Sequence, residues 1–213
     1  MHPAIRAVFV GDGTLLIRCA QAFLDAGHTL VAVASGHPAV LDWARQVQVP
    51  AIGIGDDNPL VLPEGEFDCL FSIANLRVLP ATVLARARRL ALNFHDGPLP
   101  RYAGLNAPAW ALMAQEARHG ITWHEMTPQV DAGRIARQVL FDLAPDETAF
   151  SLNARCYEAG FQAFEALLAD IAVGTLTLTP QTAPAQPLLR RHQRPRALAT
   201  LGWLGPPPAL EAP

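Results

Sequence analysis

The chain has 213 residues, of which 51% are hydrophobic and 16% charged, and its 16 basic and 19 acidic residues give a formal net charge of −3. This length is typical of one domain with an appended tail, and the charge argues against a nucleic-acid-binding protein, which usually carries a basic patch. All 16 basic residues are arginine, which excludes a Schiff-base lysine and the lysine of a phosphate-binding P-loop.

The cysteines and the apolar runs indicate the compartment. Cys19, Cys69 and Cys156 are odd in number and far apart, which is typical of reduced thiols in a cytoplasmic protein. The N-terminal segment lacks the apolar core and cleavage site of a signal peptide. No run of 18 apolar residues occurs, so we expect a cytoplasmic protein with no membrane partner.

The first half of the chain alternates short apolar runs with stretches of helical period. Such alternation is typical of βαβ units and predicts an α/β fold, with a Rossmann-like, mostly parallel sheet covered by helices on both faces. The predicted strands cover residues 7–10, 30–34, 69–73 and 90–94, and the predicted helices cover residues 16–24, 37–47 and 80–89.

The second half makes the predicted sheet mixed. Asn106 is an expected N-cap for a helix over 107–115, strands over 121–126 and 135–141 would form a hairpin, and a long helix is predicted over 148–173, closed by Gly174. Beyond residue 180 the chain is rich in proline and arginine and has no clear period. We therefore predict a catalytic domain over 1–180 and a tail or linker over 181–213.

Gly11-Asp12-Gly13 follows the first predicted strand, as in a dinucleotide-binding turn. The full fingerprint needs a third glycine at Leu16 and an acidic residue ending the second strand, and both are missing. The segment therefore predicts a tight turn between a strand and a helix.

Polar residues end the predicted strand 90–94. Asn93 and His95 alternate and so face the same side, and the carboxyl end of a parallel strand opens on the usual ligand crevice. From these residues alone, a polar strand end that caps neighbouring loops fits equally well. His119 and His124 are separated by Gly120, which predicts a turn followed by a strand and argues against a metal site.

Several motifs follow in order: Asn93-Phe94-His95, then Leu99-Pro100-Arg101-Tyr102-Ala103-Gly104, a helix with Trp110, Gly120-Ile121-Thr122, and Asp131-Ala132-Gly133. Together they resemble the formyltransferase domain family that uses 10-formyltetrahydrofolate, over about residues 71–181. That family includes methionyl-tRNA, glycinamide ribonucleotide and sugar-nucleotide formyltransferases. The resemblance implies a Rossmann-like formyltransferase fold and a one-carbon transfer without a metal.

The resemblance also implies which residues act. Asn93, His95 and Asp131 match the catalytic set of the family, although without the family Asp131 reads as an aspartate of a hairpin turn. Residues 76–80 match the stretch that receives the pterin ring, and residues 127–130 match the loop that closes the folate pocket. The implied folate-binding residues are Arg77, Val78, Leu79, Pro128, Gln129 and Val130.

The chemistry suits these residue types. An amine that attacks a formyl carbon creates negative charge on the formyl oxygen, and the Asn93 amide and the His95 imidazole are donors for it. Asp131 would hold the correct His95 tautomer, directly or through one water. A proton must also move from the amine to N10 of the folate, by way of Asp131, His95 or water.

One departure concerns the acceptor. After the histidine the family usually reads Pro-Ser-Leu-Leu-Pro, whereas this chain reads Asp96-Gly97-Pro98-Leu99-Pro100. That variant looks closest to formylation domains of nonribosomal peptide synthetases, which implies natural-product biosynthesis, an aminoacyl group on a carrier protein as acceptor, and neighbouring synthetase domains as partners. A sugar-nucleotide N-formyltransferase, a formyltetrahydrofolate hydrolase and a non-catalytic folate-binding module stay open.

Overall fold

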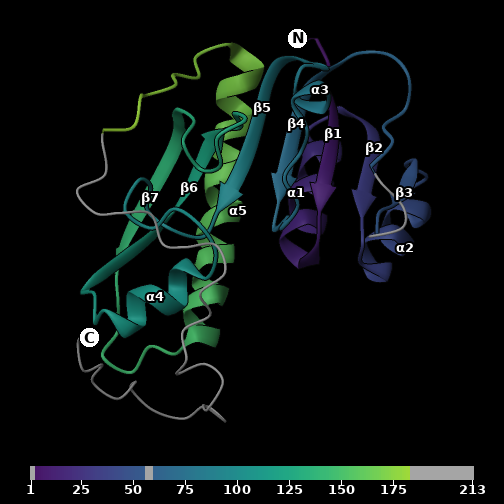
Figure 1. Ribbon diagram of the computed structural model, residues 1–213. Helices are drawn as coiled ribbons and strands as arrows, with labels where there is room; N and C mark the ends of the chain where they lie inside the picture. The colour runs from purple at the N-terminus through teal and green to yellow at the C-terminus, as the bar shows by residue number, and fades with distance from the viewer. Residues whose placement is uncertain (1–2, 56–59, 183–213) are drawn as a thin grey trace.

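The computed structural model describes residues 3–55 and 60–182 (Figure 1). Its centre is one seven-stranded sheet in the order β3-β2-β1-β4-β5-β6-β7. The five strands from β3 to β5 pair in parallel, whereas β6 pairs antiparallel with β5 and β7 antiparallel with β6. The predicted α/β fold, mostly parallel and mixed in its second half, is confirmed.

The elements follow each other in a simple order along the chain. The strands are β1 (Arg6–Gly11), β2 (Thr29–Ser35), β3 (Ala51–Gly53), β4 (Phe67–Ile73), β5 (Ala87–His95), β6 (Arg118–Glu125) and β7 (Ile135–Asp142). The helices are α1 (Gly13–Asp25), α2 (Pro38–Gln46), α3 (Ala81–Leu84), α4 (Ala107–Met113) and α5 (Ala149–Val173). None of these described helices has the length and apolar character needed to cross a membrane.

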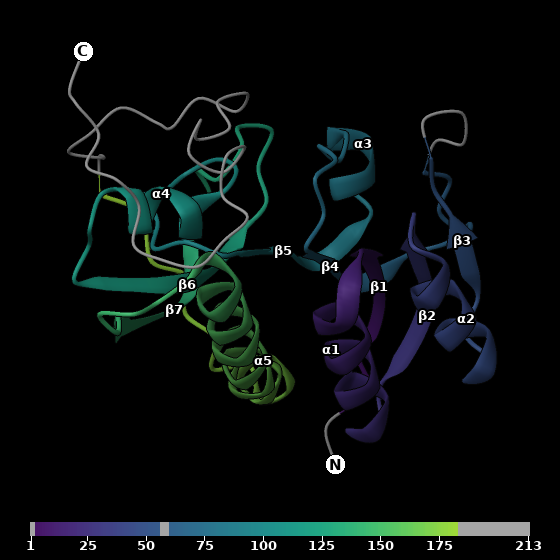
Figure 2. The same cartoon turned by 90° about the horizontal axis from the view of Figure 1, so that it is seen from below.

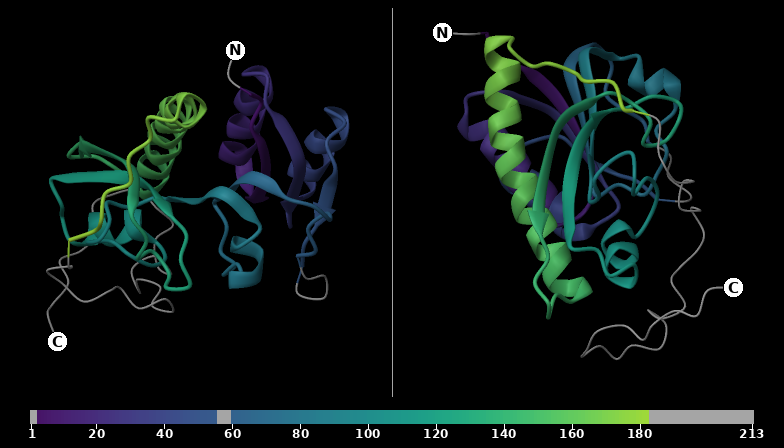
Figure 3. Two further views of the ribbon diagram at one scale, coloured as in Figure 1. Left: turned by 90° about the horizontal axis from the view of Figure 1, so that it is seen from above. Right: turned by 90° about the vertical axis from the view of Figure 1, so that its left-hand side faces the viewer.

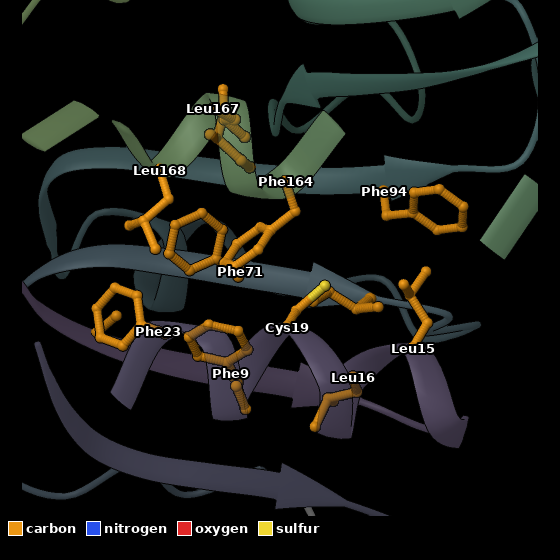
Figure 4. Close-up of a cluster of buried hydrophobic side chains, with 14 of the residues drawn as sticks. Phe9, Leu15, Leu16, Cys19, Phe23, Phe71, Phe94, Phe164, Leu167 and Leu168 are labelled. Atoms are coloured by element: carbon orange, nitrogen blue, oxygen red, sulfur yellow. The ribbon is translucent and has the colours of Figure 1, made fainter. Parts of the chain in front are cut away.

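The sheet separates two apolar layers. Figure 2 shows α1 and α5 on one side of the sheet and α3 and α4 on the other. On the α1–α5 side, Phe9, Phe71 and Phe164 pack together with ring centroids 5.0–6.0 Å apart (Figure 4). A smaller core on the opposite face includes Val8 and Leu79. Alternating strand residues supply the two layers, since Val8 and Phe9 face opposite sides.

The long helix α5 begins and ends where the sequence predicts. Thr148 and Ser151 form a reciprocal capping box, which satisfies amide groups of the first turn. Gly174 ends the helix in the left-handed conformation, with φ of 78°. The chain then returns to the sheet (Figure 3). Thr179 forms a β-bridge there with Ile135.

One local prediction is wrong: the predicted helix 80–89 ends at Leu84, because Ala87 already pairs with Phe67 as part of β5. Asn106 is the N-cap residue of α4, as predicted, but it has φ of 64° and makes no side-chain cap bond. The short strand β3 has no counterpart in the prediction, because an edge strand of three residues has too little pattern to detect.

The domain boundary at residue 180 stays a prediction. Most of the predicted tail lies outside the described residues, which end at residue 182.

Candidate active site

A cavity of about 850 Å³ opens at the carboxyl end of β4 and β5. This volume is within the range usual for small-molecule sites. The structure brings Asn93, His95 and Asp131 together in its lining. Asn93 and His95 come from the end of β5, and Asp131 comes from the loop that joins β6 to β7. Residues nearly forty positions apart thus meet because β5 and β6 are neighbours in the sheet.

Asn93 is held by a residue that sequence reasoning missed. The Nδ2 of Asn93 lies 3.1 Å from Nε2 of His124, and Nδ1 of His124 lies 2.9 Å from the Glu125 carbonyl oxygen. A carbonyl only accepts, so Nδ1 of His124 carries a hydrogen, and Nε2 accepts from Asn93 whenever Nε2 carries none. His124 therefore fixes the Asn93 amide and leaves its second N–H directed elsewhere.

His95 is anchored through one ring nitrogen. Its Nε2 lies 2.6 Å from the backbone carbonyl oxygen of Tyr102, so this nitrogen carries a hydrogen and donates it. Its Nδ1 lies 3.9 Å from carboxylate oxygens of both Asp131 and Asp96. The distance of 3.9 Å is too long for a direct hydrogen bond between His95 and Asp131, and the expected contact through one water stays a prediction. Nδ1 is left as the nitrogen that can act on a bound molecule.

Asp131 is a buried carboxylate with several partners. Its side chain is 9% exposed and accepts a hydrogen bond of 2.7 Å from the Gly104 amide. Burial by itself raises the carboxyl pKa, but His124 at 3.5 Å, the charge of His95 and the Gly104 bond together lower the pKa to about 2. Asp131 is therefore ionised at neutral pH.

The loop that carries Asp131 is fixed at both ends. Arg134 makes two 2.8 Å bonds to the Glu125 carboxylate. Gly133 is required here, because a Cβ would lie 1.8 Å from the Glu125 carbonyl oxygen. Gln181 donates its side-chain amide to the carbonyl oxygens of Asp131 and Gly133, at 2.8 and 2.7 Å. These contacts hold Asp131 at φ of 55°, a conformation that aspartate tolerates better than most residues.

The predicted folate-binding segments also reach the cavity. Arg77, Val78 and Leu79 line it after β4, and Gln129 and Val130 line it beside Asp131. Pro128 is absent from the lining, although its two neighbours in the chain, Thr127 and Gln129, belong to it.

The two histidines considered as a metal pair, His119 and His124, lie elsewhere than predicted. His119 and His124 both lie on β6 rather than on a turn and a strand. Being five residues apart, they face opposite sides. Nε2 of His119 lies 2.9 Å from the Asp96 carbonyl oxygen, and burial lowers the pKa of His119. Among residues 3–55 and 60–182, no three His, Cys, Asp or Glu side chains gather as a metal site would require.

A comparison with protein families decides the assignment. The model of the formyl transferase family matches residues 61–168, which is 108 of the 213 residues and includes every described lining residue of the cavity. The chain belongs to the formyl transferase family. The match contains the three predicted catalytic residues, whose roles stay predictions.

Solved structures show the same fold. An N-formyltransferase from Helicobacter canadensis, crystallised with folinic acid and dTDP-3-aminofucose, has a TM-score of 0.73 at 18% identity, over 87% of this formyl transferase chain and 70% of its own. Glycinamide ribonucleotide transformylase 1 from Symbiobacterium toebii has a TM-score of 0.70 at 20% identity, over 84% and 95%. Phosphoribosylglycinamide formyltransferase from Coxiella burnetii has a TM-score of 0.69 at 23% identity, over 81% and 89%.

Proposed function

We propose that this protein transfers a formyl group from 10-formyltetrahydrofolate to a primary amine, the α-amino group of an aminoacyl unit on a carrier protein in nonribosomal peptide biosynthesis. The observation that carries the proposal is the meeting of Asn93, His95 and Asp131 in one cavity of a formyl transferase family member. Formyl transfer needs donors to the formyl oxygen and a group that carries a proton. The Asn93 amide and the His95 imidazole supply the donors, and the ionised Asp131 carboxylate can carry the proton.

The donor end of the cavity fits a flat, partly apolar molecule. Leu76, Val78 and Val130 are 77%, 53% and 38% exposed, and all three line the cavity. Exposed apolar side chains around a cavity mark a ligand surface. The Helicobacter canadensis structure holds folinic acid, and a second neighbour, a sugar 3N-formyl transferase, was crystallised with 5-N-formyl-THF. The folate, when bound, supplies the formyl group.

Asn93, His95 and Asp131 have different roles in the proposed reaction. The second Asn93 N–H and the His95 Nδ1–H donate to the formyl oxygen as it gains negative charge. Because Nε2 of His95 already donates to Tyr102, a donor at Nδ1 requires the imidazolium form. The ionised Asp131, whose carboxylate lies 3.9 Å from Nδ1, is placed to relay a proton.

The charges near the cavity favour an acceptor whose amine is remote from phosphate. The N-terminus of α1 would otherwise attract an anion, but its N-cap residue Asp12 places a carboxylate beside it. That carboxylate makes no bond to the α1 amides and accepts hydrogen bonds from Ser35 Oγ and Gly36 N, at 2.5 and 3.1 Å. Among the described lining residues, Arg77 is the one with a permanent positive charge, and it lies at the donor end. An aminoacyl thioester on a long carrier arm meets this requirement.

A sugar nucleotide is the second candidate acceptor. The observation in its favour is the Helicobacter canadensis structure, which holds dTDP-3-aminofucose together with a folate and has the same fold. In such an acceptor the amine and the phosphates are separated by the sugar ring.

An acceptor panel tests the proposal. Purified protein would receive 10-formyltetrahydrofolate carrying a labelled formyl group, with an aminoacyl pantetheine thioester, an aminoacyl carrier protein, a dTDP-amino sugar, glycinamide ribonucleotide, or water alone. We expect labelled formyl amide on the two aminoacyl substrates. Label on the sugar would support the second candidate, label released as formate in every arm would indicate a hydrolase, and folate binding without turnover would indicate a binding module.

A further inference from the structure

The residue after His95 lies on the opposite face of the β5 strand end from the donor segments. Phe94 packs against Tyr157 of α5, with ring centroids 6.1 Å apart, and approaches Gly160 so closely that a Cβ there would lie 2.4 Å from its ring. Asp96, in the bend directly after β5, also lies next to α5, since its carbonyl oxygen is 3.9 Å from Sγ of Cys156. Leu79 and Met126 instead belong to the smaller core of the opposite face.

The backbone of Asp96 is firmly held, while its carboxylate faces the cavity. The Asp96 carbonyl oxygen lies 2.9 Å from Nε2 of His119 and 3.9 Å from Sγ of Cys156. The side chain is 31% exposed and lines the cavity beside Tyr157. Its carboxylate lies 3.9 Å from Nδ1 of His95, at the same distance as the Asp131 carboxylate.

This arrangement gives the two carboxylates different positions relative to the reaction. Asp131 follows Gln129 and Val130 in the chain, so it belongs to one of the proposed donor segments. Asp96 lies outside those segments and next to Cys156 and Tyr157 of α5. A primary amine is mostly protonated at neutral pH, and an ammonium cannot attack a formyl carbon. A carboxylate on the acceptor side would attract that cation and also take its proton.

We infer that Asp96 binds the ammonium group of the acceptor and accepts its first proton, an inference that rests on the proposed function. The R–NH3⁺ group gives one proton to the Asp96 carboxylate and becomes R–NH2. The nitrogen lone pair then forms a bond to the formyl carbon, the bond from that carbon to N10 breaks, and the second amine proton ends on N10. Asp96 returns its proton to water, so formamide, tetrahydrofolate and one proton are released.

The surroundings of Asp96 support a role as proton acceptor. Burial raises the pKa of its carboxyl group, and the nearby Asp131 adds to this, whereas His95 and His119 act in the opposite direction. Tyr157 is the titratable side chain that faces it from α5, together with the Cys156 thiol, and the pKa of both groups is raised as well. A carboxylate whose pKa lies closer to that of an amine takes its proton more readily.

The test compares two nucleophiles in the Asp96→Asn variant. One is an aminoacyl pantetheine thioester, whose amine is protonated at neutral pH, and the other is hydroxylamine, whose nitrogen is unprotonated there. At pH 7 we expect kcat/KM to fall by about 10²-fold with the thioester and by only a few-fold with hydroxylamine. Asp96→Glu should restore part of the thioester rate, and Asp25→Asn on the exposed end of α1 serves as the matched charge control.

The outcomes separate this inference from the proposed function. Equal losses with both nucleophiles in Asp96→Asn, with folate binding retained, would overturn the role of Asp96 while leaving formyl transfer intact. If the unmodified protein formylates neither nucleophile, the proposed function fails instead. Folate binding, followed by ligand fluorescence, reports whether the variant folds, and a variant that has lost it is replaced by Asp96→Ser, to which the same criteria apply.

Discussion

The side-chain amide of Asn93 on β5 donates to Nε2 of His124 on the adjacent strand β6, across 3.1 Å. This bond uses one N–H of the Asn93 amide and thereby fixes the direction of the second N–H. The paired strands bring the two residues directly opposite each other in the sheet. A donor to a developing oxyanion is effective only when its direction is fixed beforehand, so His124 is a positioning residue for Asn93.

We predict that His124→Phe and Asn93→Ala lower kcat by similar factors, about 10²-fold, because Asn93→Ala removes the donor and His124→Phe removes the bond that orients it. The double variant should lose little more than either single variant, since groups that act as a unit are not additive. Steady-state kinetics on the three variants supplies the comparison. Losses that multiply would show that the two residues act independently.

His95→Ala is expected to act on turnover. If Nδ1 of His95 contacts the formyl oxygen only as charge develops, its removal lowers kcat and kcat/KM together. The expected loss is at least about 10²–10³-fold, while folate binding stays within a few-fold. Turnover measured beside folate titration distinguishes this from a binding defect, which would appear mainly as a weaker folate affinity.

Asp131→Asn removes the negative charge of the side chain but keeps a residue that tolerates the left-handed backbone conformation. Asparagine also tolerates the left-handed conformation that Asp131 adopts, so the loop should keep its form. We expect a severe loss of kcat, larger than the loss in Asp96→Ala, because the charge beside His95 and a proton carrier disappear together. An active Asp131→Asn enzyme beside an inactive Asp96→Ala enzyme would mean that the two carboxylates have exchanged roles.

The pKa of Asp131 predicts an acid-sensitive fold. The carboxyl pKa is lowered from 3.8 to about 2 in the folded state, so the ionised group stabilises the fold at pH values above about 4, and this contribution is lost as the pH falls toward 2. The difference corresponds to about 2 kcal/mol. Urea unfolding at pH 6 and pH 3 should show a smaller decrease in unfolding free energy for Asp131→Asn than for the unmodified protein. Equal decreases in the two proteins would contradict the assignment.

Gln181→Ala should loosen the Asp131 loop without touching the substrate. Two hydrogen bonds to backbone carbonyl oxygens are lost, and we expect kcat to fall by roughly 10-fold with unchanged folate affinity, since a small displacement of a catalytic group is costly. Gln162→Ala on the exposed face of α5, where Gln162 bonds only to Glu158, is the matched control. A kcat equal to that of the control would indicate that the loop holds its form unaided.

The sequence was informative where local chemistry decides the structure. The period of α5, its cap at Thr148 and its terminal Gly174 are local signals, and the structure confirms them. The meeting of Asn93, His95 and Asp131 follows motifs of the formyltransferase family. The roles of these residues in the reaction remain predictions.

What sequence reasoning missed depends on distant partners. The residues before Leu90 have a composition compatible with a helix, but pairing of Ala87 with Phe67 draws them into β5. His124 carries no local sign of its bond to Asn93, which exists only because β6 returns antiparallel to β5. The contact of His119 with the Asp96 carbonyl oxygen also has no local signal.

The contact between Gln181 and the Asp131 loop bears on the order in which the site is assembled during synthesis. The strands β1 to β5 and the two residues at the end of β5 come early in the chain, whereas the two hydrogen bonds to the loop require residue 181. Domains generally fold as units during synthesis, and Phe9 and Phe71 of the parallel strands need Phe164 of α5 to complete their core. The chain must therefore be made as far as residue 181 before Asp131 acquires its last support, and the carboxylate beside His95 is among the final parts of the site to be fixed.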